Sequence, residues 1–325
     1  MKYTRNYLSF SKIMPYRIIQ ISIPPPDGEW LQVYGYRKYH RIYHSYGAGE
    51  NYQIMIRAFM GSGFDNDRNV YLNYHCKEDF SDVRFTRSDG VTFLSYWIER
   101  KLDGYYADFW VKIPDSLDEN DIFIYIYYGN PNSTSLSNGE NTFIFFDSFE
   151  TDFSKWDNIE NMSRGYEMPW EGSFSAQNKE GVSRIGKNID IENVAYGIKY
   201  IDLLHEPLTK HGMGIYGTTL YHIGVDEDFS IVHYVYRYSM TYVVTNVMRT
   251  WGWHNFEIGV VSDKTYYFID YNLVANLNMG GRTSYIGFGS SWERNQEWGY
   301  WDCVYLRKFI YPEPSHGEWG LEEVQ

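Results

Sequence analysis

Residues 71–130 read YLNYHCKEDF SDVRFTRSDG VTFLSYWIER KLDGYYADFW VKIPDSLDEN DIFIYIYYGN, and this stretch decides the fold. Short aromatic and β-branched runs alternate in it with turn residues, which is typical of an antiparallel sandwich. A Ser-Asp-Gly turn at 88–90 joins the first two strands, and Pro114 ends the third because proline donates no ladder hydrogen bond. The pattern predicts four strands, over residues 82–87, 91–100, 105–113 and 122–128.

The third of these strands shows the period-2 split of a half-buried strand. Its apolar face carries Ala107, Phe109, Val111 and Ile113. Its other face carries Tyr106, Asp108, Trp110 and Lys112. Residues 122–128 are apolar on both faces, so we expect this strand at the centre of its sheet.

The same stretch resembles a known family. The motifs CKEDFSDVRF, LSYWIE, ADFWVKIP and IYIYYGNP occur in the order found in the domain of unknown function 2341, and the opening YGYRK at 34–38 fits its start. That family occurs in archaeal and bacterial surface proteins, often beside carbohydrate-active modules. The resemblance implies a β-sandwich accessory module on a surface, and it does not imply an enzyme.

Composition limits the range of functions. A chain of 325 residues suits two domains, and its 43% hydrophobic and 19% aromatic residues exclude a disordered chain. Its 33 tyrosines favour strands and recognition surfaces. A net charge of −13 argues against nucleic acid and anionic membranes as partners. No stretch approaches the roughly 20 apolar residues of a membrane span, so we expect no membrane insertion.

The two cysteines and the N-terminal residues bear on the location of the protein inside or outside the cell. Cys76 and Cys303 fall in different predicted domains, and we favour two buried free thiols over a disulfide. Residues 1–26 lack the apolar core and cleavage site of a signal peptide. The surface resemblance nevertheless implies an extracellular location. A mature fragment, unconventional export or membership of a virus particle would reconcile the two observations.

Turn-forming residues mark the domain boundaries. The segment GNPNSTSLSNG at 129–139 is the strongest linker in the chain. The sequence therefore predicts an N-terminal arm over 1–29, a first sandwich over 30–140 and a jelly-roll domain with a short C-terminal tail over 141–325. The arm, stiffened by three prolines at 24–26, is a candidate for self-association or for packing on its own domain.

The second domain is again rich in strand patterns and has no convincing amphipathic helix, which favours a jelly roll. Strands are expected over 192–202, 220–225, 229–239, 241–248, 253–261, 266–274, 283–289 and 300–311. The runs WHNFEIGVVSDKTYYFIDYNLV, YIGFG and YWDCVYLRKFIYPEP are similar to concanavalin-like jelly rolls of the laminin-G and glucanase kind. In such modules the entry and final strands meet and often share a structural calcium.

The positions that match this calcium site are Asp147 and Glu150 near the entry and Asp302 in the last strand. Calcium takes six to eight oxygen ligands, so these carboxylates and nearby backbone carbonyls would suffice. The alternative is that Asp147 caps a turn and Asp302 forms hydrogen bonds within the sandwich. We expect any calcium here to stabilise the fold.

Two aromatic groups are candidates for glycan binding. Tyr234, Tyr236 and Tyr238 share one face of a strand and could stack pyranose rings, although tyrosines also alternate in sheets as simple cross-strand pairs. The loop 290–298 holds Trp292 and Trp298 among polar residues such as Arg294, a mixture typical of binding loops.

Hydrolysis is less well supported by the sequence. The Glu-x-Asp-x-x-Glu pattern of jelly-roll glucanases is absent, and so are a phosphate-binding glycine loop, a nucleophile elbow and an HExxH motif. The sequence thus favours a non-catalytic, carbohydrate-binding or adhesive surface module. A structural protein of a virus particle or an extracellular filament is the alternative, and a glycoside hydrolase of unfamiliar arrangement comes third.

Overall fold

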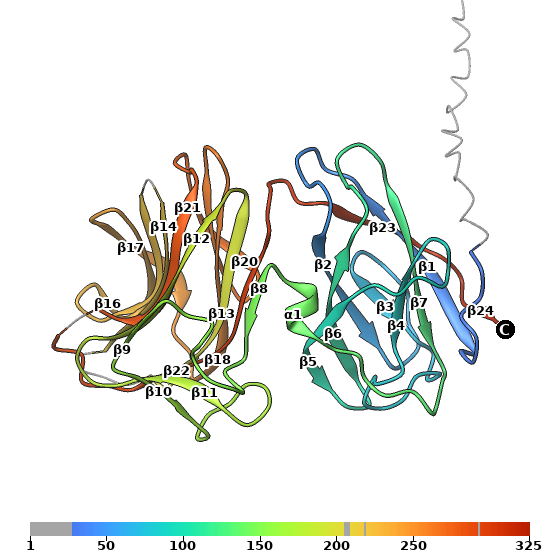
Figure 1. Ribbon diagram of the computed structural model, residues 1–325, viewed down its shortest axis with the longest axis horizontal. Coiled ribbons are helices and arrows are strands. Elements are labelled where there is room, and N and C mark those ends of the chain that lie inside the picture. Colours follow the sequence, from blue (N-terminus) through green and yellow to red (C-terminus); the bar gives the residue numbers. More distant parts are fainter. Residues whose placement is uncertain (1–27, 205–208, 218, 292) are drawn as a thin grey trace, which may run out of the picture.

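The computed structural model describes residues 28–204, 209–217, 219–291 and 293–325, and it shows two β-sandwiches side by side (Figure 1). The predicted all-β class and the two-sandwich architecture are confirmed. The N-terminal arm predicted over 1–29 lies outside the described residues up to residue 27. In the described part of the chain, no helix is long and apolar enough to cross a membrane.

The first domain packs two sheets face to face. One has the order β23-β1-β7-β4 with β24 also paired to β1, and the other has the order β3-β2-β6-β5. The strands of the first sheet are β1 (Tyr36–Tyr43), β4 (Arg84–Arg87), β7 (Ile122–Tyr128), β23 (Ser315–Trp319) and β24 (Glu323–Val324). Those of the second are β2 (Tyr52–Phe59), β3 (Asn69–Tyr71), β5 (Tyr96–Leu102) and β6 (Tyr106–Ile113).

The four strands predicted from residues 71–130 correspond to β4, β5, β6 and β7. The predicted apolar face of β6, from Ala107 to Ile113, lies in the core of the first domain. The opposite face is covered as well, because Trp110 packs in a separate cluster at the boundary with the second domain. The strand is therefore buried on both sides, by its own sandwich and by the neighbouring one.

The second domain is a jelly-roll-like sandwich of an eight-stranded and a seven-stranded sheet. The eight-stranded sheet contains β8 (Phe145–Asp147), β10 (Met162–Gly165), β11 (Ser175–Asn178), β13 (Val194–Asp202), β18 (Gly252–Val260), β19 (Thr265–Ile269), β20 (Asn272–Leu277) and β22 (Gly299–Lys308). The seven-stranded sheet contains β9 (Asn158–Glu160), β12 (Ser183–Ile191), β14 (Lys210–Gly217), β15 (Leu220–Asp226), β16 (Ser230–Tyr238), β17 (Thr241–Met248) and β21 (Thr283–Ser290).

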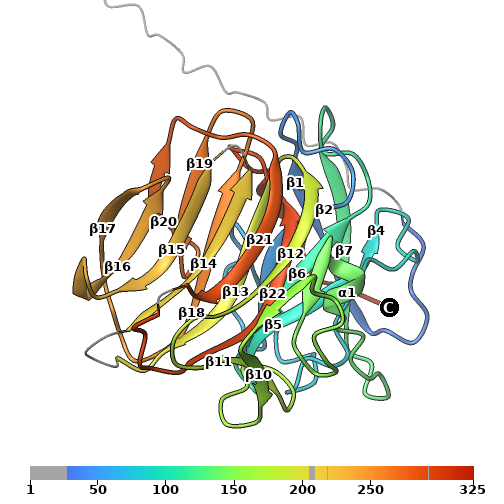
Figure 2. The same cartoon turned by 60° about the vertical axis from the view of Figure 1, so that its left-hand side comes forward.

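The seven-stranded sheet has the order β17-β16-β15-β14-β21-β12-β9, and its strands from β17 to β12 can be followed in Figure 2. Its inner face supplies Met213, Ile215, Ile286 and Phe288 to the core shared with the eight-stranded sheet. Because side chains alternate along a strand, the residues between these four face outward. The outer face is thus available for a site.

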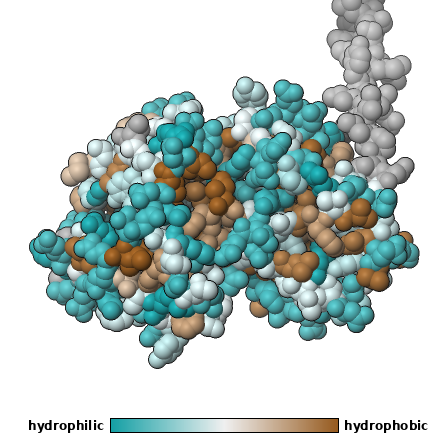
Figure 3. All heavy atoms as spheres, in the orientation of Figure 1, coloured by the Kyte–Doolittle hydropathy of each residue, from teal (hydrophilic) through white to brown (hydrophobic). Residues whose placement is uncertain are grey.

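The two domains meet through a buried aromatic cluster. Trp97 and Trp110 of the first domain pack against Phe143, Phe146 and Tyr305. The short helix α1 (Gly139–Thr142) and strand β8 lie between the two lobes (Figure 1). On the outside the lobes are divided by a waist, and apolar areas interrupt the mostly polar surface of each lobe (Figure 3).

The C-terminal strands return to the first domain. Strands β23 and β24 both pair antiparallel with β1, at Ile42–His316 and Tyr36–Val324 among other pairs. The tail that was expected beside the jelly roll therefore completes a sheet of the first sandwich. The chain crosses the domain boundary twice, once through the linker and once after β22.

Both cysteines are free and buried. Cys76 belongs to the core of the first domain, whereas Cys303 belongs to the cluster at the boundary. Burial raises the pKa of the Cys76 thiol to about 12. The expectation of two buried thiols is met.

Candidate functional site

A trough lined by glycines crosses the outer face of the seven-stranded sheet. Residues that alternate with the core positions are glycines in four neighbouring strands, and they form two rows, each across three strands, without side chains of their own. The first row joins Gly186 of β12, Gly287 of β21 and Gly214 of β14. The second row joins Gly289 of β21, Gly212 of β14 and Gly224 of β15.

Two tyrosines form one wall of this trough. Tyr216 and Tyr285 are paired across β14 and β21, and their ring centroids lie 5.4 Å apart in an edge-to-face arrangement. Tyr216 is 42% exposed. A Cβ placed on Gly186 would stand 1.6 Å from Oη of Tyr285, so glycine is what lets this ring lie across the sheet. The aromatic surface and its glycine floor depend on each other.

Polar groups stand beside the tyrosines. A recess of about 70 Å³ lies over the glycines, and a wider depression of about 820 Å³ adjoins it, with Arg184, Tyr216 and Tyr285 lining both. Nε of Arg184 donates to Glu160 at 2.9 Å, and both side chains are more than half exposed. Asp157 also lines the depression and accepts a hydrogen bond from the backbone of Asn188.

His222 closes the other side of the recess. A Cβ on Gly212 would stand 2.1 Å from its Nε2, so the imidazole lies over the glycine row. Burial, reinforced by the charges of Arg237 and Lys210, lowers the pKa of His222 to about 3. The ring is therefore neutral at physiological pH, where it can both donate and accept a hydrogen bond. Arg237 itself donates to Oη of Tyr242.

The loop 290–298, which was predicted to bind a glycan, begins at this trough. Ser290 and Ser291 line the recess. Trp292 lies outside the described residues. Trp298 is 40% exposed, and Arg294 is exposed as well. Asn295 ties the loop to the sheet, because its Oδ1 accepts the Lys210 backbone N–H at 2.9 Å and its carbonyl accepts that of Gly181 at 2.7 Å.

The proposed tyrosine platform on β16 lies on the inner face instead. Tyr234 is completely buried in the core of the second domain, where its ring packs edge-to-face against Phe256. Tyr236 and Tyr238 pack against the same core, and the Tyr236 ring lies 4.7 Å from that of Tyr267. The period-2 pattern identified a shared face correctly, but the pattern alone does not tell which face meets solvent.

The three carboxylates expected to bind calcium all accept hydrogen bonds, and Glu150 and Asp302 bind the same loop between β10 and β11. Asp147 accepts Nε1–H of Trp156 at 2.7 Å. Glu150 accepts two backbone N–H groups, from residues 173 and 174, at 2.9 Å each. Asp302 accepts the N–H groups of residues 170, 171 and 303 at 2.7–3.1 Å, and burial raises its pKa to about 7.

The entry strand β8 does pair with the final strand β22, with Asp147 opposite Val304. Within residues 28–204, 209–217, 219–291 and 293–325, no group of three His, Cys, Asp or Glu side chains is arranged to hold a metal ion. The hydrogen bonds of Asp147 and Asp302 match the alternative, in which Asp147 caps a turn and Asp302 forms hydrogen bonds within the sandwich. Calcium therefore stays a prediction.

The calcium hypothesis predicts that EDTA lowers the melting temperature by several degrees, since a ligand bound only by the folded state stabilises it. Added Ca²⁺, but not Mg²⁺, should restore the original value. Differential scanning fluorimetry measures both effects. An unchanged melting temperature in EDTA would remove calcium from the account of this fold.

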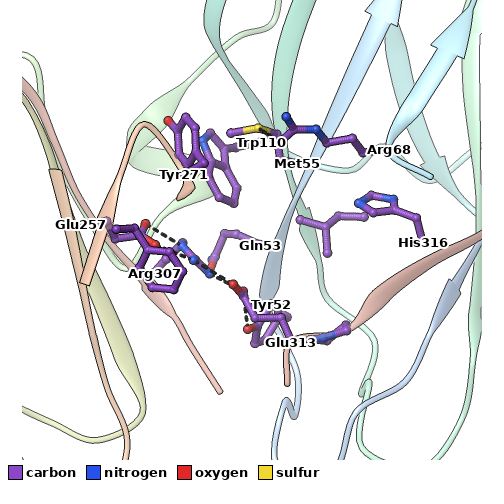
Figure 4. A pocket seen from close by; sticks show the side chains of 13 residues that line it. Tyr52, Gln53, Met55, Arg68, Trp110, Glu257, Tyr271, Arg307, Glu313 and His316 are labelled. Atoms are coloured by element: carbon purple, nitrogen blue, oxygen red, sulfur yellow. Dashed lines mark hydrogen bonds and ion pairs between the residues drawn. The ribbon is translucent and has the colours of Figure 1, made fainter. Parts of the chain in front are cut away.

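A second concave region lies between the domains, around a buried ion-pair network (Figure 4). Arg307 of β22 donates to both oxygens of Glu257 at 2.8 and 3.0 Å and to Glu313 at 2.6 Å. Glu313 also accepts the hydroxyl of Tyr52 from the first domain at 2.7 Å. Together with the aromatic cluster, these contacts join the two sandwiches.

Comparison with known proteins supports the family resemblance. Residues 79–159 match the family described as Domain of unknown function (DUF2341). This range begins shortly before β4 and ends within β9, so it covers β4 to β7 of the first sandwich and the entry to the second. None of the curated proteins compared with this chain matches it.

Several solved structures resemble part of the chain. Cellulose induced protein Cip1 has 16% identity and a TM-score of 0.38, covering 50% of this chain and 96% of its own. Carbohydrate binding module CBM66 from Bacillus subtilis has 12% identity and a TM-score of 0.33, and the match covers 46% of this chain and 98% of the module. The Bacillus licheniformis β-glucanase has 8% identity and a TM-score of 0.34, covering 50% and 97%. We take none of these likenesses as evidence of what this chain binds.

The trough was not predicted from the sequence, although a signal for it exists. Glycine alternates with large apolar residues in HGMGIYG at 211–217 and in YIGFG at 285–289. A strand that places bulky residues on one face and glycines on the other is suited to a close approach of a ligand or another backbone. Two such strands side by side indicate a groove.

Proposed function

We propose that this protein is a non-catalytic carbohydrate-binding module, and that its second sandwich binds a glycan chain in the glycine trough. The observation that carries the proposal is the pair formed by the exposed Tyr216 and the half-buried Tyr285, whose rings lie beside a row of glycines on the outer face of the sheet. The C–H faces of a pyranose ring are apolar and weakly positive, so they suit the electron-rich face of an aromatic ring.

The surroundings of the tyrosines support a polar, extended ligand. Arg184 and Asp157 can exchange hydrogen bonds with sugar hydroxyls at one end, and the neutral His222 can do so near the glycines. The exposed Trp298 and Arg294 lie on the loop that leaves the same trough, and Trp292 belongs to this proposal from its sequence position. A surface or extracellular location is part of the same proposal.

The test is retention on a panel of soluble and insoluble polysaccharides. We expect Tyr216→Ala and Tyr285→Ala each to weaken binding about tenfold or more, since stacking on an aromatic ring typically contributes 1–3 kcal/mol. Gly214→Leu should have a comparable effect, because Gly214 has an ordinary backbone conformation and its side chain would enter the trough. Affinity electrophoresis and sedimentation of the insoluble polymers measure the loss.

Tyr46→Ala is the matched control, because Tyr46 is 89% exposed on the first domain, away from the trough. Retention that survives all three trough substitutions would overturn the assignment of the site. Shortened polysaccharide chains after incubation would overturn the non-catalytic part. If no polysaccharide is retained, the alternative of a structural or assembly protein gains over carbohydrate binding.

A further inference from the structure

The cleft between the two sandwiches contains a second polar cavity, distinct from the trough. Its volume is about 280 Å³, near the lower end of the range for small-molecule sites. Both domains line it: residues of β2, β5 and β6 face residues of β13 and β18 and the turn after β19. The network of Arg307 lies in the adjoining recess, and Arg68 and Tyr271 line both spaces (Figure 4).

Cations outnumber carboxylates around this cavity, although the chain as a whole carries a charge of −13. The cationic side chains are Arg57, Arg68, Arg100 and Lys199, and the acidic ones are Glu99, Asp108 and Asp270. His254 also lines the cavity: burial opposes its charge, but its hydrogen bond to Asp270 and the charge of that group raise its pKa. An anion is the complementary ligand.

The carboxylates around the cavity already have cationic partners. Two of the guanidinium groups keep donors for a further ligand. Arg57 binds both oxygens of Asp108, at 2.6 and 2.7 Å, and Lys199 pairs with Glu99. Within the described part of the chain, Arg100 forms one ion pair, with the already paired Asp108 at 3.4 Å. Arg68 makes no ion pair among the described residues, and its Nη1 contacts Sδ of Met55 at 3.2 Å. Two arginines therefore have donors for a further acceptor.

Aromatic rings form the wall contributed by the second domain. Trp170 and Trp253 meet edge-to-face at 5.9 Å, and Lys199 lies 5.1 Å from the Trp170 ring and 5.2 Å from the Tyr271 ring. Tyr271 sits at the hairpin turn between β19 and β20 with φ of +65°, a conformation that costs energy for a bulky residue. The turn nevertheless holds its ring in the cleft.

We propose that this cleft binds an acidic monosaccharide unit, such as a uronic acid, with its carboxylate at Arg68 and Arg100 and its ring against the aromatic wall. Charge-assisted, paired hydrogen bonds from guanidinium to carboxylate supply selectivity for the acid over a neutral sugar. The rings of Trp170, Trp253 and Tyr271 supply the apolar contact. This site and the trough lie on different surfaces, so each proposal can fail without the other.

Calorimetric titration and intrinsic tryptophan fluorescence test the cleft, with the whole protein at constant ionic strength. D-glucuronate should bind saturably and change the fluorescence, whereas D-glucose at equal concentration should not. Arg68→Gln should weaken glucuronate binding about tenfold or more, and Arg68→Lys should weaken it less. Because Arg68 has no ion-pair partner among the described residues, both variants are expected to fold, which their melting temperatures will show.

Tyr46→Ala is the control, since Tyr46 is exposed, lines neither the cleft nor the trough, and its loss should leave glucuronate binding unchanged. Equal binding of glucose and glucuronate would overturn the anionic specificity. Equal binding of sodium sulfate and glucuronate would overturn the sugar. Unchanged binding in Arg68→Gln, or no saturable binding at all, would overturn the site itself.

Discussion

Arg307→Met is expected to lower the free energy of unfolding by about 3–5 kcal/mol, because it leaves the buried carboxylate of Glu257 without a counter-charge. The two side chains are only 3% and 2% exposed. The same substitution also removes the donor to Glu313, through which Tyr52 of the first domain is linked. Urea denaturation followed by tryptophan fluorescence measures the change.

Two further variants separate charge from packing. Arg307→Met combined with Glu257→Leu removes both charges and should recover at least about half of the loss, as in other buried pairs that were replaced by apolar residues. Arg282→Ala removes an exposed pair with Asp190 and should change stability by less than about 1 kcal/mol. Wild-type stability in Arg307→Met would contradict the importance of this network for the domain boundary.

Acidification from pH 7 to pH 5 is expected to remove about 2 kcal/mol of stability through His316 alone. Burial lowers the pKa of His316 to about 4, and its Nδ1 lies 2.8 Å from Nε2 of His40 in the β1–β23 pair. An unfolded histidine titrates near 6.5. The unfolded chain therefore takes up a proton first, so the contribution is fully present above pH 6.5 and is lost as the pH falls toward 4.

The comparison of wild type with His316→Gln at both pH values isolates this effect, since wild type should lose about 2 kcal/mol more than the variant. Asp302 should affect the pH dependence of stability in the opposite direction, and Asp302→Asn tests this. Burial raises the pKa of Asp302 to about 7, so lowering the pH from 8 toward 5 favours its folded state, and the variant lacks this gain. Identical pH dependence of wild type and His316→Gln would exclude the histidine as the cause.

The strand pattern predicted the fold well because it reports local burial. Alternation in residues 105–113 identified β6 and its core face, and the strand expected over 253–261 corresponds to β18. The pairing of β23 and β24 with β1 joins residues almost 300 positions apart. No local period encodes such a partner, and the tail was therefore expected beside the second domain.

The trough that we propose as the site was not predicted from the sequence, for the same reason. Sequence reasoning placed the binding surface in the second domain and drew attention to the loop with Trp298, which borders the trough. It took the tyrosines of β16 as the binding face, although Tyr234 is buried. The trough exists because Gly186, Gly214 and Gly287 meet across three strands, and that register is set by the whole sheet.

The double crossing of the boundary has a mechanical consequence. The described chain starts and ends at the first sandwich, with the carbonyl of Gly28 bound to Arg37 of β1 and Val324 paired with Tyr36 (Figure 1). Tension applied between these ends would load the first sandwich and bypass the second, which is an inserted lobe. The β1–β24 pair opens from the end at Tyr36. Such a force would therefore separate β24 and then β23 from β1, one hydrogen bond at a time, while the trough kept its shape.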